Sequence, residues 1–209
     1  GGIYSEGNLT FDASVVSGNT AANGGGIAAQ NQLELTNTTV SENTATAATT
    51  GHGGGLNISG SNPGDRLFIE GSTFSGNQAA ATGGGAQIAI HDAVIKHSTF
   101  SGNTAEGNGG AIAFRSPGGH ILWTLQSNTI ADNQSQGDGG GVYHDNSHVV
   151  TVTNTILATN RASGSPDVHG DFDSGGHNLI GDKGGSSGFI DGTDGDQVGT
   201  ASSPIDPLL

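Results

Sequence analysis

Apolar residues recur along this chain at fixed distances before an asparagine. One phrase occurs twice with a single change, as STFSGNQA at residues 72–79 and STFSGNTA at residues 98–105. An apolar residue lies three, eight and ten positions before the asparagine in each of six copies. The two-residue step between the last two positions is the period of a β-strand, in which alternate side chains share a face. The six asparagines are Asn19, Asn43, Asn77, Asn103, Asn133 and Asn160.

A pair of glycines precedes each copy, followed by a small or aliphatic residue. The pairs begin at residues 1, 25, 54, 84, 109 and 140, so successive pairs are 24, 29, 30, 25 and 31 residues apart. A repeat of this length, made of three short strands and turns, is typical of one coil of a parallel β-helix. Coils stack at about 4.8 Å, so six coils make a rod of roughly 30 Å. We predict an all-β, single-stranded parallel β-helix with six regular coils over residues 1–162.

Residues 163–209 lose this register but still contain apolar pairs, as in HGDFDSGGHNLIGD and GFIDGTDGDQVG. An open coil end exposes unpaired strand edges, which proteins normally cover. We therefore expect one or two irregular coils, or a cap, that belong to the same domain.

The repeated polar residues have structural explanations. Asparagines stacked at one turn of every coil can pass amide hydrogen bonds from coil to coil, which satisfies groups that burial would otherwise strand. Glycine pairs allow positive φ or a close approach of neighbouring backbones. We therefore predict that the six asparagines form a ladder, and we assign none of them to catalysis.

The two signatures, a glycine pair before a small or aliphatic residue and [FVIL]-x-x-N, resemble the repeats of polymorphic outer-membrane proteins. Those proteins are bacterial surface passengers with a right-handed parallel β-helix. Parallel crossovers are also strongly biased toward the right hand. The tail, with NTILATN, GGHNLIGD and GDQVGTASSPIDPLL, resembles secreted bacterial β-helix proteins that carry a C-terminal anchoring segment. The resemblance implies an extracellular or cell-surface protein with an adhesive or structural role.

Composition narrows the classes of partner. Glycine accounts for 39 of the 209 residues, and the formal net charge is −14. A strongly acidic surface repels phosphate backbones and anionic lipids, so we expect neither nucleic-acid binding nor membrane association. No apolar run approaches the roughly 18 residues that a membrane span needs. Cysteine is absent, so no disulfide framework is available.

Clustered aspartates in the tail are the candidate metal ligands. Asp191, Asp194 and Asp196 lie in a glycine-rich stretch, and carboxylate and carbonyl oxygens are the ligands that calcium prefers. The stretch lacks the spacing of an EF-hand or a calcium β-roll, and aspartate is also common in turns. Both interpretations, a calcium site and simple turns, stay open. The eight histidines show no metal-binding spacing and are expected in turns and loops.

An enzyme is the alternative to a structural or adhesive module. Pectate lyases and related hydrolases use this fold and gather carboxylates, or calcium with a basic residue, on one face. The five basic residues here are scattered over different strands and corners, which favours a protein without catalytic activity. They are Arg66, Lys96, Arg115, Arg161 and Lys183. A β-helix that binds or cleaves polysaccharide remains the second hypothesis.

Two features suggest partners. Extended loops at residues 59–66 and 115–120 are rich in turn residues, and loops of solenoids often form the binding surface. A glycan or another cell-surface ligand is the expected partner there. The chain also begins in the middle of a coil, with GGIY. We expect that copies could stack head to tail, last coil on first, and so build a filament.

Overall fold

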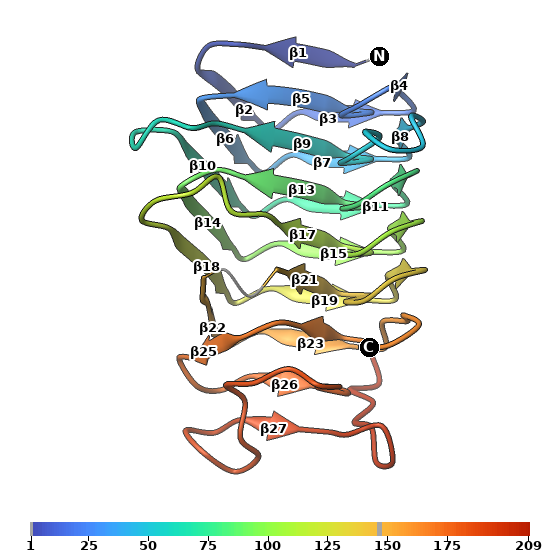
Figure 1. The fold of residues 1–209 in the computed structure, drawn as a ribbon, viewed down its shortest axis with the longest axis vertical. Helices are drawn as coiled ribbons and strands as arrows, with labels where there is room; N and C mark the ends of the chain where they lie inside the picture. Colours follow the sequence, from blue (N-terminus) through green and yellow to red (C-terminus); the bar gives the residue numbers. More distant parts are fainter. Residues whose placement is uncertain (1, 146–147) are drawn as a thin grey trace.

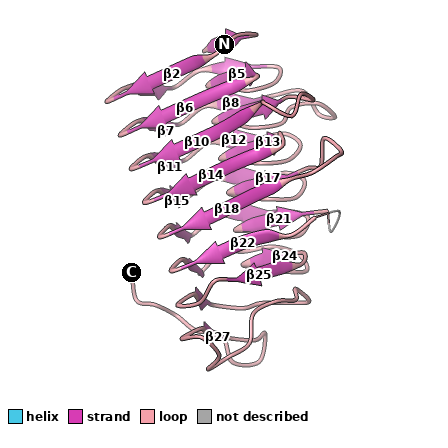
Figure 2. Cartoon of the chain, turned by 90° about the vertical axis from the view of Figure 1, so that its left-hand side faces the viewer, coloured by secondary structure: helices cyan, strands magenta, loops and turns pink. Residues whose placement is uncertain are grey.

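The chain winds into a parallel β-helix of strands and turns (Figures 1 and 2). The computed structural model describes residues 2–145 and 148–209. Every pairing between strands of successive coils is parallel, as the sequence predicted. None of the described residues belongs to a helix long and apolar enough to cross a membrane.

Four sheets run along the rod, and we name them A to D. Sheet A contains β1 (Ile3–Ser5), β5 (Ile27–Gln30), β9 (Leu56–Ser59), β13 (Ala86–Ala89), β17 (Ile112–Phe114), β21 (Val142–His144) and β24 (Val168–His169). Sheet B contains β2 (Leu9–Asp12), β6 (Gln32–Thr36), β10 (Arg66–Glu70), β14 (Asp92–Lys96), β18 (Leu122–Gln126), β22 (Val150–Thr153) and β25 (Phe172–Ser174).

The other two sheets complete each coil. Sheet C contains β3 (Val15–Ser17), β7 (Thr39–Ser41), β11 (Thr73–Ser75), β15 (Thr99–Ser101), β19 (Thr129–Ala131), β23 (Ile156–Ala158), β26 (Leu179–Ile180) and β27 (Gln197–Val198). Sheet D contains β4 (Thr20–Ala21), β8 (Thr44–Ala45), β12 (Gln78–Ala79), β16 (Thr104–Ala105) and β20 (Gln134–Ser135). Three strands per coil were predicted, and sheet D is the fourth because its two-residue strands look like turns in the sequence.

Like residues stack on like inside the rod, in the predicted register. Leu33 pairs with Leu67 in sheet B, and Val40, Phe74 and Phe100 follow one another in sheet C. The rings of Phe74 and Phe100 lie parallel, with centroids 4.6 Å apart. Buried apolar area of this kind is the main source of the stability of the fold.

Glycines let the backbones of adjacent coils meet at the corner before sheet A. A Cβ atom on Gly84 would lie 2.3 Å from the carbonyl oxygen of Gly110 and 2.6 Å from that of Thr104. Gly84 therefore stacks on Gly110, and the predicted alignment of Gly84 with Gly109 was wrong by one residue. The error arose because Ala111 takes the place of the third glycine in this copy.

The last turns are less regular than the coils before them. Sheets A and B end with β24 and β25, whereas sheet C continues through β26 to β27. The segment after β27 runs back along the preceding coil, where the backbone N–H of Ile205 donates to the carbonyl of Gly181 at 2.9 Å. Figure 1 accordingly shows the chain end well above β27.

Candidate functional site

The predicted asparagine ladder runs through the interior of the rod. Asn77 donates from its backbone N–H and from Nδ2 to Oδ1 of Asn103, at 3.0 and 2.9 Å. Its Nδ2 also donates to the carbonyl of Val40 in the preceding coil, at 2.9 Å. The same pattern links Asn43, Asn77, Asn103, Asn133 and Asn160, and half-buried Asn19 donates to Asn43. These asparagines hold neighbouring coils together, and Asn160 also lines a pocket with Asp167 and Asp182.

Asp167 receives the last hydrogen bonds of this ladder. Asn160 donates to Oδ1 of Asp167 from its backbone N–H at 2.9 Å and from Nδ2 at 2.8 Å. The backbone N–H of Asp182 donates to Oδ2 at 2.7 Å. Burial raises the pKa of Asp167 to about 6, although these donors oppose the shift. No sequence pattern marked this role, because Asp167 follows Asn160 by only seven residues and lies outside the repeat register.

A second ladder, not foreseen from the sequence, lies at the corner between sheets B and C. Each residue in it donates a backbone N–H to the side-chain oxygen of the next. Its buried members are Thr38, Ser72, Ser98, Asn128, Thr155, Asn178 and Asp196. Asp196 accepts from the backbone N–H of Asn178 at 2.9 Å and from its Nδ2 at 3.1 Å. Both ladders therefore end on an aspartate.

The three predicted calcium ligands do not converge. The other carboxylate oxygen of Asp196 accepts from the hydroxyl of Ser174 at 2.6 Å, and Asp191 accepts from the backbone N–H of Val198 at 2.9 Å. Asp194 sits in a turn with φ of 49°. Throughout residues 2–145 and 148–209, no three His, Cys, Asp or Glu side chains gather closely enough to hold a metal ion. Calcium binding by these aspartates stays a prediction.

Histidines occupy corners and covered positions. His97 adopts a φ of 50° at the corner after β14. His144 is buried, and its Nε2 lies 2.6 Å from the carbonyl oxygen of Asp171. Burial lowers the pKa of His144 and of His52, which keeps both rings neutral near pH 7.

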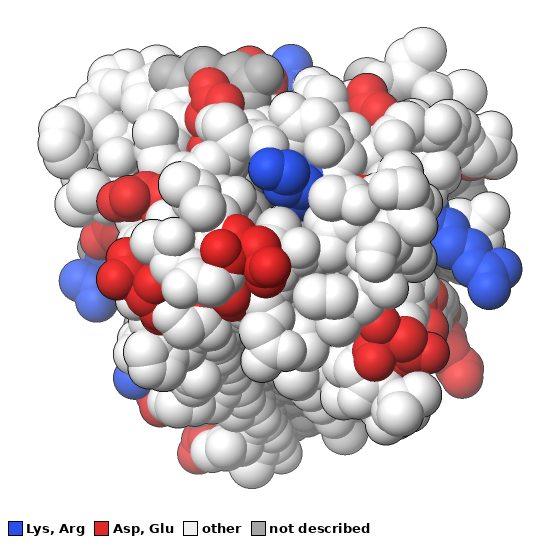
Figure 3. All heavy atoms as spheres, turned by 90° about the horizontal axis from the view of Figure 1, so that it is seen from below, with Lys and Arg blue, Asp and Glu red and all other residues white. Residues whose placement is uncertain are grey.

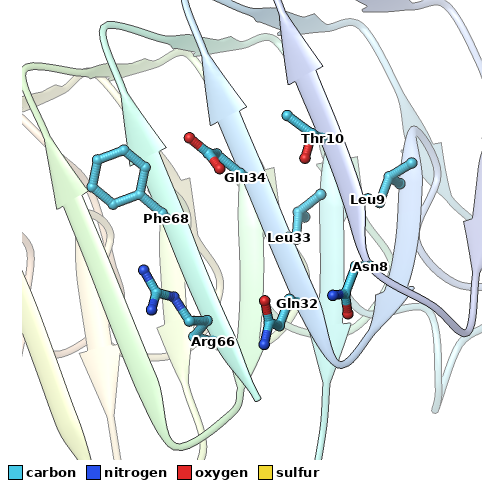
Figure 4. Close-up of a pocket in the computed structure, with 8 residues that line it drawn as sticks. All are labelled: Asn8, Leu9, Thr10, Gln32, Leu33, Glu34, Arg66 and Phe68. Carbon is cyan, nitrogen blue, oxygen red and sulfur yellow. The ribbon is translucent and has the colours of Figure 1, made fainter. Parts of the chain in front are cut away.

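A concave surface lies on the outer face of sheet B (Figure 4). Strands β2, β6 and β10 supply its walls, and it encloses about 450 Å³. In Figure 4 the side chains of Glu34, Phe68 and Arg66 lie on the same face of these strands. The lining residues are Asn8, Leu9, Thr10, Gln32, Leu33, Glu34, Arg66 and Phe68.

Strand register explains how these residues meet. Phe68 pairs with Glu34, which pairs with Thr10, and Arg66 pairs with Gln32. Outward residues at matching positions lie about 4.8 Å apart along the rod. The coils differ in length because of the loop at residues 59–66 and the long corner at residues 46–55, so these side chains are 24 and 34 positions apart in the sequence. No periodic pattern in the sequence marks them as a group.

The aromatic ring of this groove has a charged neighbour, Lys96. Lys96 Nζ lies 5.0 Å from the centroid of the Phe68 ring and 3.1 Å from Oε1 of Glu70. A cation at this distance is attracted to the ring face and restrains the ring. Among the described residues, Arg66 takes part in no ion pair within 4.0 Å. The exposed guanidinium is therefore available to a ligand.

The arrangement suits a polyhydroxylated ligand. An aromatic ring can pack against the C–H face of a sugar, while amide, guanidinium and carboxylate groups exchange hydrogen bonds with hydroxyls. Glu34 is the one carboxylate among the eight lining residues. Most glycosidases need two carboxyl groups about the scissile bond. The groove thus has the chemistry of binding more than of cleavage.

Acidic side chains are scattered over the end of the rod that carries the last coils. Figure 3 views this end and shows several acidic groups with few basic ones between them. The net charge of −14 is consistent with that picture. A neutral or basic partner is favoured over an anionic one at this end.

Comparison with known proteins identifies the repeat. Residues 97–115 match the family model of the Chlamydia polymorphic membrane protein repeat. This segment contains the second copy of the repeated phrase and the glycine pair that follows it. The chain carries a β-helix repeat of the polymorphic membrane protein type, as its resemblance predicted. Neither a search of curated proteins nor a search of solved structures found a match.

Proposed function

We propose that this β-helix is an adhesive module displayed at a bacterial cell surface, and that it binds glycan along the outer face of sheet B. The observation that carries the proposal is the groove of Figure 4, where Phe68, Arg66 and Glu34 share one rigid face. Sites built on strands hold their geometry better than sites built on loops. A rod with a fixed face suits repeated, weak contacts with a polymer.

Surface display is supported by the type of repeat. The matched repeat is named for the polymorphic membrane proteins of Chlamydia. The chain is acidic and contains no cysteine, so it has no thiol that would have to be kept reduced. Extracellular or cell-surface localisation accordingly forms part of the proposal. Detection of the protein on intact cells by antibody, with and without external protease, would test it.

Binding is preferred over cleavage as the role of the groove. One carboxylate lines it, with Arg66 and Gln32 as its polar neighbours. If the groove cleaved its ligand, substitution of Glu34 by Gln would abolish product formation while leaving binding in place. For a binding groove, we expect no reducing ends to appear with any polysaccharide that binds.

The test is affinity for a panel of bacterial and host polysaccharides, measured on the whole chain by titration calorimetry. We expect Phe68→Ala and Arg66→Gln each to weaken the best ligand by about tenfold, the effect of losing roughly 1.4 kcal/mol. Arg161→Gln, which changes the same residue type outside the groove, is the matched control. Unchanged affinity in both groove variants, or equal loss in the control, would overturn the proposal.

Stacking of copies end to end remains a separate prediction. One end of the rod presents strands from all four sheets, β1 to β4, whereas at the other end β27 extends sheet C by itself among the described strands. A head-to-tail joint would therefore pair fewer strands than two regular coils do. Sedimentation velocity over a concentration series would reveal filaments as a growing fast fraction.

A further inference from the structure

We propose a second ligand site, a small pocket on the outer face of sheet A that takes a single sugar ring. It goes beyond the groove on sheet B, because it lies on another sheet and rests on other residues. The outward positions of sheet A form a row along the rod. From coil to coil the row reads Tyr4, Ala28, Asn57, Gln87, Ala113, Tyr143 and His169.

The small side chain of Ala113 leaves a hollow in this row. Its neighbours along the rod are Gln87 on one side and Tyr143 on the other. The pocket measures about 280 Å³, just below the roughly 300–1,000 Å³ of typical small-molecule sites, which limits it to a small ligand. Its lining residues are Thr82, Asn108, Ala113, Arg115, Tyr143 and Asp145.

Tyr143 offers one aromatic face to this hollow. The other face is covered by His169 of the next coil, with ring centroids 5.1 Å apart and planes at 15°. Because the stacked rings are nearly parallel, the remaining face of Tyr143 points back along the rod toward Ala113. A flat, restrained aromatic face beside a small floor residue is suited to the C–H face of a sugar ring.

Polar groups of both kinds surround the aromatic face. Arg115 is exposed and forms no ion pair within 4.0 Å among the described residues. Oδ1 of Asn108 accepts from the backbone N–H of Asp138 at 2.9 Å, which fixes the amide and leaves its Nδ2 as a donor. Asp145 adds a carboxylate to the lining. Donors and acceptors together match the hydroxyls of a sugar, which both give and receive hydrogen bonds.

An unsatisfied donor lies one coil away from Ala113, on its register partner Gln87. Gln87 is 2% exposed, and its Nε2 has no hydrogen-bond partner in the structure. Its Oε1 is already used, since the hydroxyl of Thr82 donates to it. A buried donor without an acceptor is costly, and native proteins rarely leave one in place. Gln87 does not itself line the pocket, so an oxygen of a bound sugar would become its acceptor once the amide turned toward Ala113.

The test is saturation-transfer NMR on the whole chain with glucose, galactose, mannose and their N-acetylamino forms at millimolar concentration. The decisive variant is Ala113→Gln, which fills the hollow with a side chain that the same row already holds at Gln87. Its matched control is Ala28→Gln. Ala28 lies in the same row and also beside a tyrosine, Tyr4, but the residue two positions later is Gln30, where the pocket has Arg115. A second pair, Tyr143→Leu and Tyr4→Leu, removes the aromatic face at each place.

We expect at least one sugar to give a signal that falls at least fivefold in Ala113→Gln and Tyr143→Leu and persists in both controls. Circular dichroism of each variant establishes that the fold is intact. No signal from any sugar, or a signal unchanged by both pocket variants, would overturn the proposal. A signal lost in Phe68→Ala would also overturn it, because the sugar would then occupy the groove on sheet B. Failure here leaves the glycan proposal for that groove untouched.

Discussion

The regular coils up to Asn160 and the segment that follows them use different side chains to accept the buried hydrogen bonds of the ladders. In the regular coils an asparagine passes hydrogen bonds to the next asparagine. In the last turns the acceptor is an aspartate, Asp167 for the first ladder and Asp196 for the second. The difference shows that position within a ladder, more than burial, decides which polar side chain fits.

The direction of the hydrogen bonds explains the change. Each ladder residue donates its backbone N–H toward the C-terminal end of the rod, and its side-chain oxygen accepts from the coil before it. In the first ladder the side-chain amide of an interior member also donates to the next coil, which a carboxylate could not do. The final member needs only to accept, and a carboxylate offers two oxygens for that purpose. An aspartate therefore ends a ladder at the position where the amide of an asparagine would lack an acceptor in the next coil.

The largest expected effect on stability comes from placing an aspartate, the residue that ends each ladder, at an interior ladder position. Asn103→Asp keeps the shape of the side chain but removes the donor to the carbonyl of Phe74 and to Oδ1 of Asn133. It also buries a charge that faces another oxygen. We expect the free energy of unfolding to fall by about 4 kcal/mol or more at pH 7, measured by urea titration.

Asn19→Asp is the matched control for that substitution. Asn19 is half-buried at the first ladder position, where water can reach the side chain. We expect a loss of about 1 kcal/mol there. Equal losses at Asn19 and Asn103 would show that ladder position does not matter, and the comparison between the two regions would fail.

The next effect tests how closely the coils approach in each region. Gly84→Ala places a Cβ 2.3 Å from the carbonyl oxygen of Gly110, so backbone must shift. Gly185, in the tail, has nothing within 4 Å of the same added atom. We expect Gly84→Ala to cost about 3 kcal/mol and Gly185→Ala to change stability by less than about 0.5 kcal/mol. Thermal unfolding by calorimetry distinguishes them, and a tolerated Gly84→Ala would contradict the tight stacking.

Sequence and structure agree best where residues repeat in register. The stacking of Leu33 on Leu67 and of Asn77 on Asn103 followed from spacing alone, because identical coils place identical residues on one line. Asp167 was not predictable as the end of a ladder, since a loop brings it there from outside the register. The groove on sheet B was missed for a related reason. Outward residues such as Phe68 and Glu34 carry no periodic signal, and a loop of irregular length separates them.

A smaller effect should appear as a dependence of stability on pH. Asp167 has a pKa of about 6 in the folded chain against 3.8 as the ordinary value. The folded state thus binds a proton more tightly, so its stability rises as pH falls through 6 and the gain is lost above it. Between pH 7.5 and 5 this group contributes about 1 kcal/mol.

Comparison with Asp167→Asn isolates that contribution from the other acidic groups. The carboxamide oxygen still accepts from Asn160, but the side chain no longer titrates. We expect the difference in free energy of unfolding between the two proteins to change by about 1 kcal/mol across this range, measured by urea titration at each pH. A constant difference would mean that Asp167 keeps an ordinary pKa and that burial at the ladder end is less complete than in the structure.

The smallest expected effect concerns calcium in the tail. The carboxylates of Asp196 and Asp191 already accept hydrogen bonds from Asn178, Ser174 and Val198, so a cation would have to displace them. We therefore expect chelation by EGTA to shift the Tm by about 1 °C or less, equivalent to a few tenths of a kcal/mol. Asp194→Asn, which alters the carboxylate in the turn between them, should behave like the unmodified chain. A drop of several degrees on chelation, absent from Asp194→Asn, would show that the tail rearranges around calcium. The second ladder would then end on a metal site, and the tail would differ from the regular coils in binding a metal as well as in carrying the ends of the ladders.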